Sequence, residues 1–217
     1  MPSGKRSSVS PLKKKSPRGE SHATAPHTGR PRSELARAAL LETAYNMMKK
    51  HSLGEITTQG IAAKAGVSTA TVYRWWDTKE ALLVDAFLDV KSQNVQMAQS
   101  GSPLHRLREY FIAGGKFLQG EHGLVAARVL GAIQDDAKLR EHFTERFYVP
   151  DLSEMMEVAK QAVDAGELPS KTDLSLFLDM PLGMCLARTL LRREPIRWQD
   201  SAAAFDIAVA GATSYWG

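Results

Sequence analysis

The sequence predicts an all-α protein, and three observations lead to that prediction. Apolar residues recur at three- and four-residue spacing along most of the 217-residue chain after residue 32, and glycine and proline fall between these stretches. No stretch alternates apolar and polar residues as a half-buried strand would. We therefore expect short helices over residues 33–85 and a domain of longer helices over residues 86–217.

The first 32 residues differ in composition from the rest. They are rich in Ser, Pro and Gly with almost no large apolar side chain, so they are predicted to be disordered. They hold eight Lys and Arg against one Glu, a net +7, and since the whole chain carries +4 the remainder carries −3. A basic tail favours nucleic acid as a partner, and it equally suits a solvated segment that only keeps a protein soluble.

Cysteine usage and hydropathy indicate a soluble, cytoplasmic protein. Cys185 is the single cysteine, so no disulfide can form within the chain, and a reducing compartment is expected. The basic N-terminus is not followed by the apolar run of a signal peptide. The most apolar stretch, residues 174–191, is interrupted by Asp179, Pro181 and Arg188 and falls short of the roughly 20 apolar residues that span a bilayer.

Capping residues set the expected helix starts. Ser33 is placed to cap the first helix and Ser68 the third, because a short hydroxyl side chain accepts hydrogen bonds from free N–H groups there. Asp77, with Glu80 three residues later, is typical of a capping box at the fourth. The predicted helices span residues 34–51, 57 or 58 to 65, 68–75, 77 to about 99, 103–119, 122–134, 137–146, 150–165, 171–192 and 198–213.

Gly66 lies between two of the shortest predicted helices. Ala62, four residues earlier, is small enough for the helices to approach closely, and glycine accepts the left-handed backbone that a sharp turn requires. This combination is typical of a helix-turn-helix.

The helix after this turn has two different faces. At about 100° per residue, Val72 and Trp76 share one side, and Ala70 and Arg74 lie opposite. Thr69, Thr71 and Tyr73 flank the second side. Small, hydroxylic and guanidinium side chains suit a helix in a DNA major groove, whereas an ordinary solvent face would favour Glu and Lys. The pattern therefore favours contact with double-stranded DNA.

The stretch "ITTQGIAAKAGVSTATVYRWWDTKEALL", residues 56–83, resembles the DNA-binding domain of the TetR-type (tetracycline-repressor-like) transcriptional regulators. With the preceding helix the resemblance covers about 50 residues, and the rest of the chain shares the family's typical length and helical character. It implies a homodimeric regulator that binds a pseudo-palindromic operator, most often a repressor released by a small-molecule inducer.

The resemblance also implies roles for single residues. Phosphate contacts are implied for five side chains, namely Thr58, Ser68, Thr71, Tyr73 and Lys79. Base-edge contacts are implied for Thr69, Ala70 and Arg74. Trp75 either touches the DNA backbone or packs against the domain, and both alternatives stay open.

One residue near the turn agrees with the family pattern, and two depart from it. Trp76 corresponds to an aromatic core residue of the family. Gly60 lowers helix propensity inside the second helix, and Asp77 places an acid near the phosphates.

The basic tail ends in "GRPR", residues 29–32, immediately before the first helix. An arginine arm at this place can lie in the minor groove, where narrow A/T-rich DNA deepens the negative potential. Arg30 and Arg32 are therefore candidate DNA contacts.

The C-terminal domain is expected to hold a ligand pocket and a dimer interface. Pocket candidates are large apolar residues that also suit an ordinary core: Phe111, Phe117, Leu130, Met155, Phe177, Met180 and Met184. The last two helices are apolar over wide arcs, which predicts a four-helix dimer interface. The interface candidates are Leu178, Leu182, Leu186, Leu190, Ile207 and Ala210.

No catalytic residue, cofactor or metal site is expected. The six histidines lack ligand spacing on one helix, and the sequence has no phosphate-binding glycine loop, no Gly-x-Ser-x-Gly elbow and no Cys/His nucleophile pattern. Two alternatives remain beside the repressor. One is a helical ligand- or partner-binding protein with a non-functional helix-turn-helix, which Asp77 and the neutral charge of residues 33–85 favour; the other is a transcriptional activator.

Overall fold

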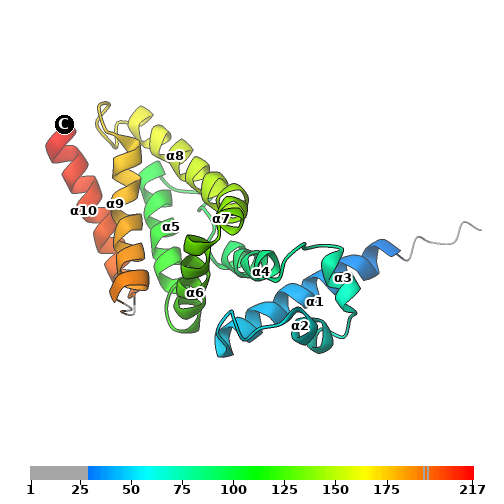
Figure 1. Ribbon diagram of the computed structural model, residues 1–217. Coiled ribbons are helices and arrows are strands. Elements are labelled where there is room, and N and C mark those ends of the chain that lie inside the picture. Colours follow the sequence, from blue (N-terminus) through cyan, green and yellow to red (C-terminus); the bar gives the residue numbers. More distant parts are fainter. Residues whose placement is uncertain (1–28, 193, 195) are drawn as a thin grey trace, which may run out of the picture.

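The computed structural model describes residues 29–192, 194 and 196–217, and over these residues the chain is helical without strands (Figure 1). The all-α prediction is confirmed. Of the predicted disordered arm, residues 1–28 lie outside the described residues, and residues 29–32 are helical, so the prediction of disorder is wrong for these four.

The N-terminal lobe contains three helices, α1 (Gly29–Lys50), α2 (Thr58–Lys64) and α3 (Thr69–Tyr73), and α4 (Lys79–Asn94) leads out of it. α1 begins four residues before Ser33, so the prediction that Ser33 caps it is wrong. Pro31 falls in the first turn, where its missing N–H would have no partner within the helix, and it therefore does not end the helix.

Hydroxyl side chains cap the next three helices. Thr57 Oγ1 accepts from Gly60 N at 3.0 Å, and Ser68 Oγ accepts from Thr71 N at 3.3 Å, as predicted for Ser68. The cap of α4 is Thr78, whose Oγ1 accepts from Ala81 N at 3.1 Å. The predicted capping box at Asp77 is therefore wrong, because the extended residue that opens the helix is the next one.

The C-terminal lobe contains α5 (Pro103–Phe117), α6 (Glu121–Asp135), α7 (Ala137–Phe143), α8 (Val149–Asp164), α9 (Leu174–Leu186) and α10 (Trp198–Trp216). Two π-helical segments, η1 (Thr144–Tyr148) and η2 (Ala187–Arg192), extend α7 and α9. η1 runs directly into α8, where Pro150 lacks the N–H that would bond to the carbonyl of Arg146. Pro150 lies in the first turn of α8, a position where a proline is tolerated.

α4 lies between the two lobes (Figure 1). It packs against α1 on one side and against α5, α6 and α7 on the other, while α6 also reaches α1. One continuous hydrophobic core runs from Leu40 in α1 to Ala212 in α10. The two lobes are therefore packed together and not joined by a free linker.

The cap of α4 gives a first test. Thr78→Ala is expected to lower the free energy of unfolding by about 1 kcal/mol, because the N–H of Ala81 loses its acceptor. Asp77→Ala is the matched control and should change it by at most a few tenths of that value. Urea denaturation followed by circular dichroism measures both, and an equal loss for the two variants would show that Asp77 is the cap.

Candidate DNA interface and ligand cavity

α2 and α3 form a helix-turn-helix around Gly66. Gly66 has φ of +70°, which L side chains rarely adopt, and the N–H of Val67 donates to the carbonyl of Ala62 at 3.0 Å. Ala62 is buried in the contact between the helices. The predicted turn geometry is confirmed, and it fixes the direction in which α3 leaves α2.

One face of α3 and the residues that follow it anchor the helix in the core. Val72 and Trp76 are buried, and the indole Nε1 of Trp76 donates to Asp85 Oδ2 at 2.9 Å. Asp85 lies on α4, so this hydrogen bond ties the end of the recognition helix to the helix between the lobes.

The opposite face of α3 is open. Tyr73 is 54% exposed, Ala70 and Arg74 are also exposed, and Thr69 and Thr71 are half-buried. The guanidinium of Arg74 donates to Ser33 Oγ at 3.2 Å, which places the first part of α1 beside α3. The hydroxyl of Tyr73 and the guanidinium of Arg74, at the C-terminal end of α3, therefore lie on the same open surface as the start of α1.

Trp75 lies between two cations. The guanidinium carbons of Arg37 and Arg74 are each 5.8 Å from the centroid of its ring, within the range of a cation–π contact. Trp75 is 36% exposed, so it is neither a core residue nor a free surface group. Arg37 is a residue that sequence reasoning missed, because this contact joins residues 38 positions apart.

Two residues expected to contact phosphate are not free to do so in this structure: Thr58 is buried, and Lys79 is bound to other groups of the protein. Thr58 is buried with 8% of its surface exposed, which corrects the expectation of a presented hydroxyl; the exposed threonine at this turn is Thr57. The ammonium of Lys79 donates to the carbonyl of Leu53 at 2.9 Å and pairs with Glu80 at 3.3 Å. The side chains of Arg30 and Arg32 lie outside the described residues.

Asp85 is the first junction between the lobes. It is buried, and besides the bond to Trp76 its carboxylate is hydrogen-bonded to His142 Nε2 at 2.9 Å. It also forms an ion pair with the guanidinium of Arg146 at 3.6 Å. His142 belongs to α7 and Arg146 to η1, so one carboxylate joins the recognition helix to the C-terminal lobe.

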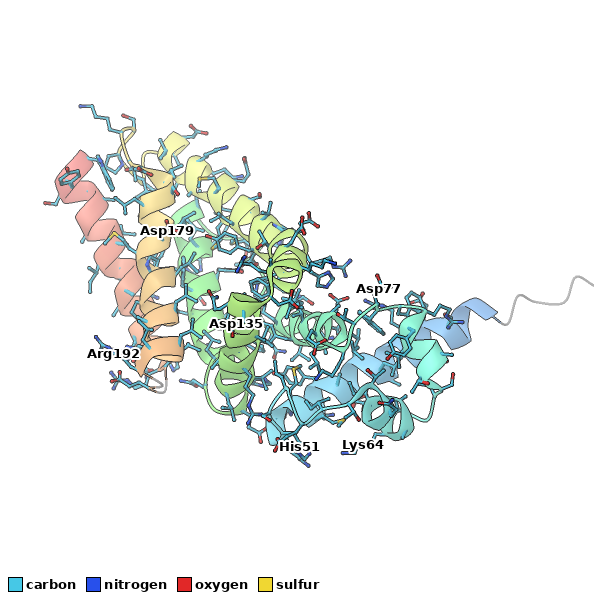
Figure 2. All side chains as sticks on the ribbon, viewed as in Figure 1. His51, Lys64, Asp77, Asp135, Asp179 and Arg192 are labelled. Carbon is cyan, nitrogen blue, oxygen red and sulfur yellow. The ribbon has the colours of Figure 1, made fainter. Side chains whose placement is uncertain are left out.

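α6 forms a second junction with α1. Arg128 donates to the carbonyls of Met48 and, at 2.7 Å, His51, at the end of α1 where His51 is labelled in Figure 2. Tyr45 of α1 is hydrogen-bonded to Nδ1 of His122. Burial and then Glu121 raise the pKa of Tyr45 to about 12, while burial and then Lys49 lower the pKa of His122.

A cavity of about 500 Å³ lies within the C-terminal lobe, and residues of α4 to α9 and of both π-helical segments line it. Its wall is mostly aromatic and aliphatic. At one place Lys91 Nζ donates to Tyr110 Oη at 2.8 Å and to Asp151 Oδ1 at 2.6 Å, and it lies 4.5 Å from the ring centroid of Phe147. Burial and the neighbouring Asp151 raise the pKa of Tyr110, so its hydroxyl stays protonated.

Two sequence profiles match this architecture. Residues 40–86 match the family described as "Bacterial regulatory proteins, tetR family", and residues 97–208 match "Tetracyclin repressor-like, C-terminal domain". The chain belongs to the TetR family. It is therefore a DNA-binding transcriptional regulator with an N-terminal helix-turn-helix and a C-terminal helical domain.

Relatives of this TetR regulator agree with the assignment. YdeS of Bacillus subtilis, an uncharacterized HTH-type transcriptional regulator, is 29% identical over 168 residues, or 77% of this chain and 85% of YdeS. AqdR of Rhodococcus erythropolis, an HTH-type transcriptional regulator, is 28% identical over 65% of this chain and 68% of its own.

Solved structures share the fold. The TetR family transcription regulator SCO0332 gives a TM-score of 0.69 at 21% identity, covering 81% of this chain and 97% of its own. The transcriptional regulator FadR from Bacillus subtilis, solved in complex with stearoyl-CoA, gives 0.67 at 17% identity over 80% and 98%.

The predicted pocket residues of this TetR regulator divide into two groups. Four of them line the cavity: Phe111, Phe117, Leu130 and Met155. Phe177 is fully buried against Phe205, at 5.7 Å between ring centroids, and Met180 is 45% exposed. Phe177, Met180 and Met184 are absent from the described lining, because the α9 residues that reach the cavity lie on a different arc of that helix.

The predicted interface residues need a similar correction. Leu178 is fully buried, and three leucines of the set line the cavity: Leu182, Leu186 and Leu190. Ile207 is 65% exposed, and Ala210 is also exposed. On α9 Leu186 of the predicted set is also 46% exposed, and Leu176 and Met180, which lie outside the predicted set, are exposed as well.

The His122–Tyr45 contact predicts a pH-dependent stability. Since the fold lowers the pKa of His122 below its ordinary 6.5, the unfolded chain takes up the proton first as pH falls. The free energy of unfolding should therefore stay constant above about pH 6.5. It should decrease as the pH falls from 6.5 to the lowered pKa that His122 has in the folded protein. Urea denaturation at pH 7.5, 6.5 and 5.5 measures this change.

His122→Gln is the control, because it keeps a hydrogen-bonding group beside Tyr45 and removes the titration. The difference in stability between the two proteins should shrink at low pH, where the wild type loses its advantage. A difference that does not vary from pH 7.5 to 5.5 would contradict the assignment.

Proposed function

We propose that this protein is a homodimeric repressor that binds a pseudo-palindromic operator and is released by a small-molecule inducer. Members of the TetR family bind DNA operators and act as dimers. The observation that supports the proposal most is Asp85, because its contacts connect the recognition helix to residues adjoining the cavity.

The open face of α3 is the proposed base-reading surface. Thr69, Ala70 and Arg74 meet base edges in the major groove, with the guanidinium able to bridge a guanine. Arg74 is hydrogen-bonded to the neutral Ser33, and it can exchange this bond for one to a base at little cost.

Phosphate contacts are proposed around this surface. Ser68, Thr71 and Tyr73 supply hydroxyls, while Thr57 replaces Thr58 at the start of α2. The two cations at Trp75 hold its ring at the surface, from where it and Arg37 can meet the sugar–phosphate backbone. Lys79 would have to leave the carbonyl of Leu53 to contribute.

The start of α1 supports the arginine arm. Arg74 bonds Ser33, and Arg30 and Arg32 lie in the first turn of the same helix, so this turn of α1 lies next to the recognition helix. We propose that Arg30 and Arg32 enter the adjacent minor groove.

A second copy is the proposed partner of α9 and α10, which form the outer edge of the C-terminal lobe (Figure 1). The stretch Leu174–Arg192, expected from its sequence to be too short of apolar residues, is by length and composition alone apolar enough to cross a membrane, and 22% of its most apolar 18-residue window is buried. Exposed Leu176, Met180 and Ile207 lie on these two helices. Pairing with the same helices of a second copy would cover this apolar surface in a four-helix bundle.

The proposed release mechanism uses the register of α7 and η1. His142 and Arg146, four residues apart, face Asp85, whereas their neighbours Phe143 and Phe147 line the cavity. A ligand that displaces the two phenylalanines therefore shifts the two cations, and Asp85 and Trp76 with them. A small rotation of α3 then spoils the spacing of about 34 to 36 Å between recognition helices.

A gel-shift with DNA from upstream of the protein's own gene tests the DNA contacts. Arg74→Ala and Tyr73→Ala are each expected to weaken binding by about 10-fold, because each removes a contact worth about 1 to 3 kcal/mol. Lys138→Ala, an exposed charge loss on α7, is the control and should leave affinity unchanged within about twofold.

The wild-type protein decides between the alternatives. If it binds none of the upstream DNA, the chain is instead a partner- or ligand-binding protein with a non-functional helix-turn-helix, for which the exposed Asp77 is the best support. Repression and activation are separated by a reporter gene carrying the bound site, whose expression should rise when the regulator is deleted.

A further inference from the structure

The lining of the cavity gives information about the chemical class of its ligand. We infer that the cavity takes an uncharged, lipophilic molecule with a single hydrogen-bond acceptor, and that it disfavours carboxylates, sulfonates and phosphates. The inference rests on the proposed function in that this ligand is the inducer.

The size and the wall of the cavity set the first limit. About 500 Å³ falls within the range of cavities that bury most of a drug-sized molecule. Phe87, Phe111, Phe117 and Phe147 provide aromatic surface on several sides. Such a wall stabilises apolar ligands by removing their surface from water, and it offers sugars or nucleotides few partners.

The charge of Lys91 is already balanced. Its ammonium lies 2.6 Å from Asp151 Oδ1 and donates to Tyr110 Oη at 2.8 Å. An incoming anion would have to displace Asp151 and leave a buried carboxylate unpaired, which is costly. A carbonyl, ether or hydroxyl oxygen needs only the third N–H of Lys91 and leaves the pair in place.

The rest of the lining adds no positive charge. Among the lining residues that the structure describes, Lys91 is the one Lys or Arg, against the two carboxylates Asp151 and Asp179. Asp179 is exposed on α9, where Figure 2 labels it, so an anion entering past it would meet a like charge. The cavity therefore differs in charge from what a polyphosphate ligand such as stearoyl-CoA would need.

Two glycines allow the cavity to be filled without disturbing its wall. Gly114 on α5 and Gly183 on α9 both line it, and an added Cβ at either meets no heavy atom within 4 Å. Leucine at these positions has space to enter the cavity and raises helix propensity, so the variants should stay folded. Gly131 on α6 is equally open but lies outside this cavity, which makes Gly131→Leu the matched control.

Two fluorescent probes that differ chiefly by one charge provide the experiment on the full chain. N-phenyl-1-naphthylamine is neutral, and 1-anilinonaphthalene-8-sulfonate adds a sulfonate to the same rings. The neutral probe is expected to bind one per chain and at least 10-fold more tightly than the sulfonate. Gly114→Leu and Gly183→Leu should each weaken binding of the neutral probe at least 10-fold, whereas Gly131→Leu should leave its affinity unchanged. Stearoyl-CoA should not displace the neutral probe.

Charge variants test the stated cause. Asp151→Asn frees the ammonium of Lys91 and should tighten sulfonate binding several-fold while leaving the neutral probe nearly unchanged. Asp179→Lys, at an exposed position that cannot disturb the core, should act in the same direction. Sulfonate binding that neither variant tightens would show that the charge of the lining does not select the ligand.

Other outcomes would overturn the inference outright. One such outcome is that the neutral probe does not bind. The other is that the sulfonate or stearoyl-CoA binds as tightly as the neutral probe, and that Gly114→Leu abolishes this binding. Operator release is measured separately in a gel-shift with saturating neutral probe. A probe that binds in the cavity without lowering operator affinity counts against the proposed function and leaves the ligand class supported.

Discussion

A buried carboxylate on α4 is the constraint on which the arrangement of the two lobes depends. A charge removed from water must be paired and hydrogen-bonded, and Asp85 meets this requirement with hydrogen bonds to Trp76 and His142 and an ion pair with Arg146 at 3.6 Å. These partners come from the end of the recognition helix, from α7 and from η1. Any arrangement that separated the lobes would remove His142 and Arg146 from the carboxylate, so the position of α3 and the packing of the C-terminal lobe are set together.

The proline at the start of α8 contributes to this arrangement. Pro150 cannot continue the hydrogen-bond pattern of a regular helix, and the chain widens into the π-helical segment η1 just before it. The widened segment carries Arg146 on the side of Asp85 and Phe147 on the side of the cavity. A segment with a non-standard hydrogen-bond pattern between two regular helices is a suitable place for small changes in register, because it has less regular bonding to lose.

The features that the sequence predicts well are local. Gly66 and Ser68 could be assigned because a left-handed turn and an N-cap depend on a few neighbouring residues. The exposed residues of α9 could be predicted only in part, because a helix that is apolar on most sides does not reveal by periodicity which arc meets the core: Leu178 is buried, whereas Met180 and Leu186 are exposed. The burial of Thr58 and the contact of Arg37 with Trp75 depend on residues that are distant in the sequence, and the sequence gives no signal for such contacts.

The contact between α6 and the end of α1 affects how far this protein can be treated as modular. The last carbonyls of a helix have no partners within it, and here Arg128 of the C-terminal lobe satisfies those of Met48 and His51. The helix-turn-helix lobe is thus completed by a side chain that its own sequence does not contain. A chimaera that grafts this lobe onto another regulator's C-terminal domain would need an arginine at the equivalent place on α6, together with donors for Asp85, before it could inherit the DNA specificity of the parent.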